Sequence, residues 1–325
     1  MLCRNISAQR DATTRQVISE VLTQWSETQL PKWCWLTLGS DGRCEQTLLG
    51  DQDNAIVFDG PGDQHRREFM QLARQINERL AELGAPLCPG KVMAMNEKWC
   101  RSIDEWHEAA IQWLRTPNPE HLLEACIFLD FRGVAGEMAF AQDLRQWLCH
   151  QIRQQPYFIR TLAQDAIRDD FATPALGMIG VHLSRALRRH GLSGSWFADI
   201  AIDTKAFGVS AAMCFVRVLA LSRGIEATST DERLVQLAKI GAMTQRESDQ
   251  LRHAFDRMQH YRLRAQLEFC DAQPGGLEVV VASAPPPVVN VLGLDGLKTE
   301  EIKALYDAMK TLKRLRRRVE LEFLR

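Results

Sequence analysis

The chain has 325 residues, which is long enough for two domains with hydrophobic cores of their own. Its 40 lysines and arginines nearly balance its 41 aspartates and glutamates, and the resulting net charge of −1 argues against a dedicated nucleic-acid-binding protein. The nine cysteines are scattered without a C-x-x-C pair, which argues against a disulfide framework or a zinc site, and without a signal peptide or a long apolar run we expect a cytoplasmic protein.

The first 30 residues predict an amphipathic helix. Apolar side chains, among them Val17, Ile18 and Val21, recur at near-helical spacing, and Pro31 ends the segment. We expect residues 1–30 to form an N-terminal helix that packs on the domain that follows.

Residues 33–38 predict a short buried strand, and the next residues predict an anion-binding turn. The strand is rich in aromatic and apolar side chains, and Gly39 ends it where a helix could begin. Free backbone N–H groups at a helix N-terminus suit a phosphate, Gly39 allows close approach, and Ser40 adds a hydroxyl. Arg43 could contact the same phosphate, or it could pair with Glu45 or Asp51.

A second predicted strand, residues 51–58, begins with two carboxylates. Because side chains alternate along a strand, Asp51 and Asp53 are expected on one face, where their like charges repel unless a cation lies between them. Mg²⁺ takes carboxylate and phosphate oxygens together, so it is the expected cation, with Mn²⁺ as an alternative. The phosphate-binding turn and the acid pair together predict a site for a nucleoside triphosphate.

The rest of the chain predicts one more small piece of sheet and then helices. A helix ends near Gly84, residues 86–96 predict a last short strand, and apolar periodicity from Trp99 onward predicts long helices. One of these is expected from His121 to about Trp147. The predicted fold is therefore α+β, with a small mixed sheet in residues 31–96 and an all-helical bundle in residues 97–325.

The spacing of these motifs resembles that of a known enzyme superfamily. Gly39-Ser40 followed by Asp51-x-Asp53 is similar to the signature of polymerase-beta-type nucleotidyltransferases. The fuller strings G-S-D-G-R-x-E-Q and D-Q-D-N-A resemble a narrower group, the DUF294-type nucleotidyltransferases. This group is related to the bacterial PII-protein uridylyltransferase and glutamine-synthetase adenylyltransferase. The resemblance implies that Asp51 and Asp53 are catalytic metal ligands and that Gly39 and Ser40 bind nucleotide.

The resemblance also points to residues beyond the signature, and to one departure from it. Many nucleotidyltransferases carry a third carboxylate on the next strand, whereas this chain has Met93 and Met95 in that region. The helical domain is implied to bind substrate. Asp130 and Arg132 would either line the nucleotide site or pair internally, and Lys205 would contact the triphosphate or be an ordinary surface lysine.

The expected reaction is transfer of a nucleoside monophosphate from the triphosphate to an acceptor hydroxyl, with release of pyrophosphate. The acceptor could be a protein. The missing third carboxylate leaves open a nucleotide-binding regulatory protein without catalysis. An RNA-directed enzyme is a further alternative, which the near-neutral charge does not favour.

Overall fold

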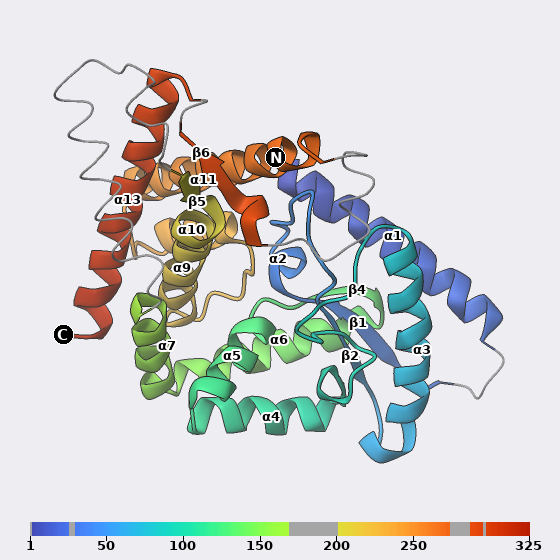
Figure 1. The fold of residues 1–325 in the computed structure, drawn as a ribbon. Helices are drawn as coiled ribbons and strands as arrows, with labels where there is room; N and C mark the ends of the chain where they lie inside the picture. Colours follow the sequence, from blue (N-terminus) through green and yellow to red (C-terminus); the bar gives the residue numbers. More distant parts are fainter. Residues whose placement is uncertain (1, 26–29, 169–200, 274–286, 295–296) are drawn as a thin grey trace. The chain divides into compact units, whose positions relative to one another are not determined.

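The computed structural model of the chain describes residues 2–25, 30–168, 201–273, 287–294 and 297–325 (Figure 1). The described residues form two compact units. The first runs as far as Gln155, and the second runs from Pro156 to Phe269 and over the C-terminal residues. Among the described helices, none combines the length and the apolar character needed to cross a membrane.

The first unit alternates helices with short strands. Its elements are α1 (Leu2–Gln24), β1 (Trp33–Thr37), α2 (Gly39–Gly42), β2 (Asn54–Phe58), α3 (Gly62–Glu82), the 3₁₀ turn Glu97–Trp99, β3 (Cys100–Ser102), α4 (Ile103–Arg115), α5 (Pro119–Phe128), β4 (Arg132–Gly136) and α6 (Met138–Arg153). The strands form one sheet in the order β3-β2-β1-β4. β1 is antiparallel to both of its neighbours, and β2 is parallel to β3, so the sheet is mixed.

Helices α1 and α3 cover one face of this sheet. Alternation along the strands directs Trp35 of β1 and Ile56 of β2 to that face, where they join a common core with α1 and α3. The helical members of the core are all apolar: Val17, Ile18, Val21, Phe69, Leu72, Ala73, Ile76 and Leu80. The N-terminal helix therefore shares its buried face with the sheet.

Helix α4 contacts β2 and β3, and helix α6 contacts β1, β2 and β4. The buried indole of Trp106 on α4 donates a hydrogen bond from Nε1 to Ile56 O at 3.0 Å, and its ring stacks on Phe128 at a centroid distance of 4.1 Å. The tryptophan periodicity that predicted a helix from Trp99 onward thus serves core packing.

The segment 86–96 is not a strand, contrary to the expectation from its sequence. It runs beside the start of β2 and accepts backbone hydrogen bonds there, from Gln52 N to Pro86 O and from Asn54 N to Val92 O. The Pro89-Gly90 turn and the positive φ of Lys91, 57°, prevent a continuous ladder. The parallel neighbour of β2 is instead β3, which lies farther along the chain.

The single helix expected from His121 to Trp147 is also wrong. Residues 132–136 form β4, which pairs with β1 and separates α5 from α6. Gly136 has a φ of +86°, and a Cβ placed on it would lie 2.2 Å from Trp33 O, so the glycine allows the two backbones to approach. Strand pairing in the tertiary structure here overrides the local helical pattern.

The second unit consists mostly of helices. Its described elements are α7 (Pro156–Arg168), β5 (Ala201–Asp203), the π-helical turn Lys205–Ser210, α9 (Ala211–Leu221), α10 (Thr230–Lys239), α11 (Gln245–Asp271), the 3₁₀ turn Pro287–Asn290, β6 (Val291–Gly293) and α13 (Thr299–Phe323). β5 and β6 pair antiparallel. The all-helical bundle expected in residues 97–325 lies partly outside the described residues.

These two units confirm the α+β class, with a small mixed sheet followed by a helical region. The sheet draws β3 and β4 from beyond residue 96, so the first unit is larger than the segment 31–96 expected to hold the nucleotidyltransferase domain. The segment 97–325 is correspondingly not helical throughout.

Candidate functional site

The antiparallel pairing of β1 and β2 brings the two halves of the sequence signature together. Thr37, at the end of β1, pairs with Asn54, at the start of β2, and Leu38 N donates a 2.9 Å hydrogen bond to Asp53 O. Gly39 therefore lies beside Asp53. Gly39 has a φ of +55°, and a Cβ placed on it would lie 2.6 Å from Asp53 Oδ2. The glycine thus makes room for the carboxylate.

Asp51 and Asp53 lie just before β2 rather than within it, and the thiol of Cys88 lies close to both carboxylates. One carboxylate oxygen of each acid and Sγ of Cys88 all lie within 4.8 Å of one another. The two acids are half-buried and Cys88 is buried. Burial, followed by the negative charge of Asp53, raises the pKa of the Cys88 thiol to about 12. Two carboxylates and a thiol at this spacing form a donor set that fits a divalent cation.

Sequence reasoning missed Cys88. It lies in the segment 86–96, which runs beside residues 52–54, so its backbone contacts bring it to the acid pair. Met93 is buried, and its Sδ accepts a 3.4 Å hydrogen bond from Cys88 N. Glu97, the nearest acid downstream, is well exposed and pairs with Arg66. In the cluster that the described residues form here, the third group beside Asp51 and Asp53 is therefore a thiol.

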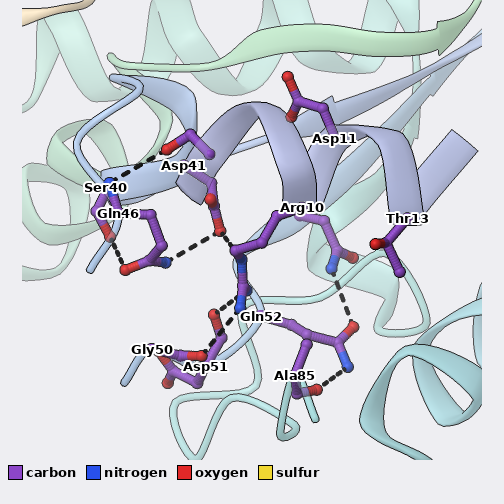
Figure 2. A network of polar contacts seen from close by, with 12 residues as sticks. Arg10, Asp11, Thr13, Ser40, Asp41, Gln46, Gly50, Asp51, Gln52 and Ala85 are labelled. Atoms are coloured by element: carbon purple, nitrogen blue, oxygen red, sulfur yellow. Dashed lines mark hydrogen bonds and ion pairs between the residues drawn. The ribbon is translucent and has the colours of Figure 1, made fainter. Parts of the chain in front are cut away.

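The expected helix after Gly39 is the single turn α2, which is held by polar side chains (Figure 2). Ser40 Oγ lies 3.2 Å from Gln46 Oε1, and Gln46 Nε2 donates to Asp41 Oδ2 at 3.0 Å. Gln46 also approaches the backbone closely, because a Cβ placed on Gly50 would lie 2.5 Å from its Oε1. Gln46 thus connects the Ser40 turn to the loop that leads to Asp51.

Arg43 and Asp130 form a buried ion pair. Arg43 NH1 donates to Asp130 Oδ2 at 2.9 Å, and Arg43 Nε donates to Glu45 Oε2 at 2.8 Å. Asp130 has no exposed surface. Of the alternatives that the sequence left open, the contacts favour internal pairing for Asp130, and Glu45 is one of the partners of Arg43. The pair fixes α2 to the segment before β4.

Arg132 joins β4 to the N-terminal helix. Its two terminal nitrogens donate to the two oxygens of Asp11 at 2.8 and 3.0 Å, and NH2 also lies 3.2 Å from Asp41 O. Burial would lower the pKa of Arg132, but the hydrogen bonds and charge of Asp11 outweigh it, so this pKa is raised.

Lys205 lies in the second unit, where it is exposed at the start of the π-helical turn.

A cavity of about 250 Å³ lies within the first unit, between α1, the end of α3 and the start of β2. Its walls combine apolar side chains, such as Trp35 and Leu80, with polar ones that include Arg10, Asp41 and Asp53. The site thus has space for a small group next to Asp53.

Two family models match the chain, one in its N-terminal part and one in its C-terminal part. The family model described as "Putative nucleotidyltransferase DUF294" matches residues 1–120. A second model, described as "Putative nucleotidyltransferase substrate binding domain", matches residues 157–323. A search of the curated proteins finds no match to the chain.

Proposed function

The chain belongs to the DUF294 family of nucleotidyltransferases, and from this premise we propose that it transfers a nucleoside monophosphate from a nucleoside triphosphate to an acceptor hydroxyl. In this reaction the acceptor oxygen bonds to the α-phosphorus and loses its proton, while the bond to the β-phosphate oxygen breaks and pyrophosphate leaves. The C-terminal part matches a substrate-binding domain, which supports separate roles for the two matched parts: the N-terminal part would carry out the transfer, and the C-terminal part would bind substrate.

One observation carries the proposal: the carboxylate of Asp53 lies directly against Gly39, beside the Asp51–Cys88 cluster. A triphosphate at the Gly39-Ser40 turn would therefore have two carboxylates within reach of its phosphates. Asp51 and Asp53 would hold a divalent cation, Mg²⁺ or Mn²⁺, which neutralises phosphate charge when it is bound. Ser40 and the backbone at Gly39 would bind the distal phosphates.

Cys88 is the third donor in this proposal. It belongs to the segment 86–96, in which the resemblance led us to expect a third carboxylate, and its sulfur lies within 4.8 Å of a carboxylate oxygen of each acid. A thiolate is a softer ligand than a carboxylate, so ligation by Cys88 would shift the metal preference of the site from Mg²⁺ toward Mn²⁺. Arg43 and Arg132 support the site through Asp130 and Asp11 in this reading, and Lys205 is a proposed triphosphate contact from the second unit.

The segment 86–96 carries no carboxylate, and this also supports a second function, in which the protein binds nucleotide and signals without catalysis. Calorimetry with a nonhydrolysable triphosphate and Mn²⁺, run together with a pyrophosphate-release assay, separates the two. Release in the presence of an acceptor supports the transferase. Binding without release, over a range of acceptors, supports the regulatory protein.

We propose that the acceptor is a hydroxyl on a protein, because the DUF294-type sequences resemble enzymes that modify proteins. The near-neutral net charge does not favour RNA. Incubation of the protein with each radiolabelled triphosphate in a cell lysate, followed by gel electrophoresis, tests this directly, because a labelled protein band identifies both the nucleotide and the acceptor class.

A further inference from the structure

Arg10 of α1 contacts both halves of the proposed active site (Figure 2). Its Nε donates to Asp41 Oδ2 at 2.9 Å. Its NH1 and NH2 donate to Gly50 O at 3.3 Å and to Asp51 O at 3.0 Å. Asp41 follows Ser40 in α2, and Gly50 and Asp51 form the end of the loop that carries the first acid. A single guanidinium therefore bridges the phosphate-binding turn and the metal-binding acid.

This bridge is largely shielded from water. The side chain of Arg10 is 23% exposed and that of Asp41 is 8% exposed, so the ion pair is screened less than a surface pair would be. Charge-assisted hydrogen bonds from a guanidinium are strong and directional. The two carbonyl oxygens on the Asp51 loop accept from separate nitrogens, which restrains the loop in position and in orientation.

The helix that carries Arg10 is itself anchored in two ways. Val17 and Ile18 of α1 pack in the core beneath the sheet. The neighbouring residue, Asp11, binds Arg132 of β4, and Arg132 in turn donates to Asp41 O. Asp41 is thus contacted at its side chain by Arg10 and at its backbone by Arg132. The core and β4 therefore help to set the position of Arg10.

We propose that Arg10 is a positioning residue that fixes the distance between Ser40 and Asp51, so that the N-terminal helix is part of the catalytic unit. This inference rests on the proposed nucleotidyl transfer, because it assigns Arg10 a role in aligning the triphosphate with the acids. In this role Arg10 acts through Asp41 and the Asp51 backbone. Displacement of a reacting group by about 1 Å can lower a rate about 100-fold, so restraint of this loop matters for catalysis.

The test compares Arg10→Met and Arg10→Lys with wild type. Arg15→Met is the matched control, because Arg15 lies on the same helix and is exposed. For each protein we would measure the thermal midpoint, kcat and KM for the triphosphate, Mn²⁺ affinity by electron paramagnetic resonance, and hydrogen exchange of the peptide spanning residues 39–53. A lysine at residue 10 can pair with Asp41, but its single ammonium group cannot also donate to Gly50 O and Asp51 O as the separate guanidinium nitrogens do.

We expect Arg10→Met to lower kcat by about 100-fold, with a smaller change in KM, while the folded protein is retained. Arg10→Lys should recover part of this loss, and Arg15→Met should behave as wild type. Hydrogen exchange should rise within residues 39–53 and stay unchanged in β1. Unchanged kcat together with unchanged exchange in Arg10→Met would overturn the inference, and so would a loss of exchange protection spread evenly over the whole first unit.

The exchange measurement separates this inference from the proposed function. If wild type transfers no nucleotide, the proposed function fails. A local rise in exchange at residues 39–53 in Arg10→Met, with a lower Mn²⁺ affinity, would still support the positioning role. If hydrogen exchange and Mn²⁺ affinity in Arg10→Met equal those of wild type, the positioning role is rejected, whether or not the wild-type protein is an active transferase.

Discussion

Gly39 and Asp53 are in direct contact, such that any Cβ at residue 39 would lie 2.6 Å from Oδ2 of the acid. Two parts of the chain separated by the whole α2 loop meet at this point, because β1 ends where β2 begins. Gly39 also has a φ of +55°, which side-chain-bearing residues rarely adopt. Both its conformation and its neighbour therefore require glycine.

Gly39→Ala should consequently abolish transfer by displacing the Asp53 carboxylate. The matched control is Gly241→Ala. Gly241 has a φ of +74°, but a Cβ there would meet nothing within 4 Å, so its replacement adds only backbone strain, about 1–2 kcal/mol. Thermal unfolding and transfer rate should be measured for both. Equal activity losses in the two variants would show that backbone strain, rather than contact with Asp53, explains the effect.

The buried pair of Arg43 and Asp130 should matter for stability. Asp130→Ala removes the carboxylate that accepts from Arg43 NH1, while Glu45 still accepts from Nε, and should lower the free energy of unfolding by about 1.5–3 kcal/mol, measured by denaturant titration. Glu82→Ala is the control, because it removes an exposed ion pair with Arg79. We expect its unfolding curve to match that of wild type. A small effect of Asp130→Ala would mean that Arg43 finds another partner.

Cys88 should change the optical spectrum of a bound metal. With Co²⁺ as a probe, coordination by the thiolate should produce a sulfur-to-cobalt charge-transfer band in the near ultraviolet. Cys88→Ser should remove this band and shift the metal preference of transfer from Mn²⁺ toward Mg²⁺. Cys126→Ser, at a partly exposed cysteine of α5, should retain the band. A band that survives in Cys88→Ser would place the thiol outside the metal site.

Acid should weaken the start of α4 through Glu105. Burial alone would raise the pKa of Glu105, but the hydrogen bond from Ser102 N and the charge of Arg66 lower it below its usual value of 4.5. A carboxyl group with a depressed folded-state pKa stabilises the protein above the unfolded-state pKa, and this contribution is lost as the pH falls through the folded-state pKa. Glu105→Gln should therefore reduce stability at pH 7 and flatten its decline below pH 4.5. Parallel pH curves for the two proteins would refute this role.

The sequence predicted the parts of the site that depend on local patterns. Strand β1, the Gly39-Ser40 turn and the approach of Asp53 follow from an apolar run, a glycine and a short spacing, each of which is readable within a few residues. The α+β class follows in the same way. In these cases local preference and tertiary structure agree.

The parts that sequence reasoning missed depend on partners far along the chain. Residues 132–136 form a strand only because β1 offers an edge to pair with, so their local pattern was misleading. Arg43 binds Asp130 across 87 positions, and Arg10 reaches Asp41 across 31. The local pattern of apolar residues carries no information about contacts between residues so far apart in the sequence. Cys88 reaches the acids through an irregular segment whose backbone contacts Gln52 and Asn54, which no strand pattern would indicate.

The most direct test of the account is nucleotidyl transfer by the Asp51→Asn/Asp53→Asn double variant. Transfer of label from α-³²P-labelled triphosphate to protein acceptors would be measured with Mg²⁺ and with Mn²⁺, beside wild type and Asp104→Asn, a control at an exposed acid of α4. The account predicts that wild type and Asp104→Asn transfer equally and that the folded double variant loses transfer with either metal. Full transfer by the double variant would contradict the assignment of these two acids as the catalytic centre.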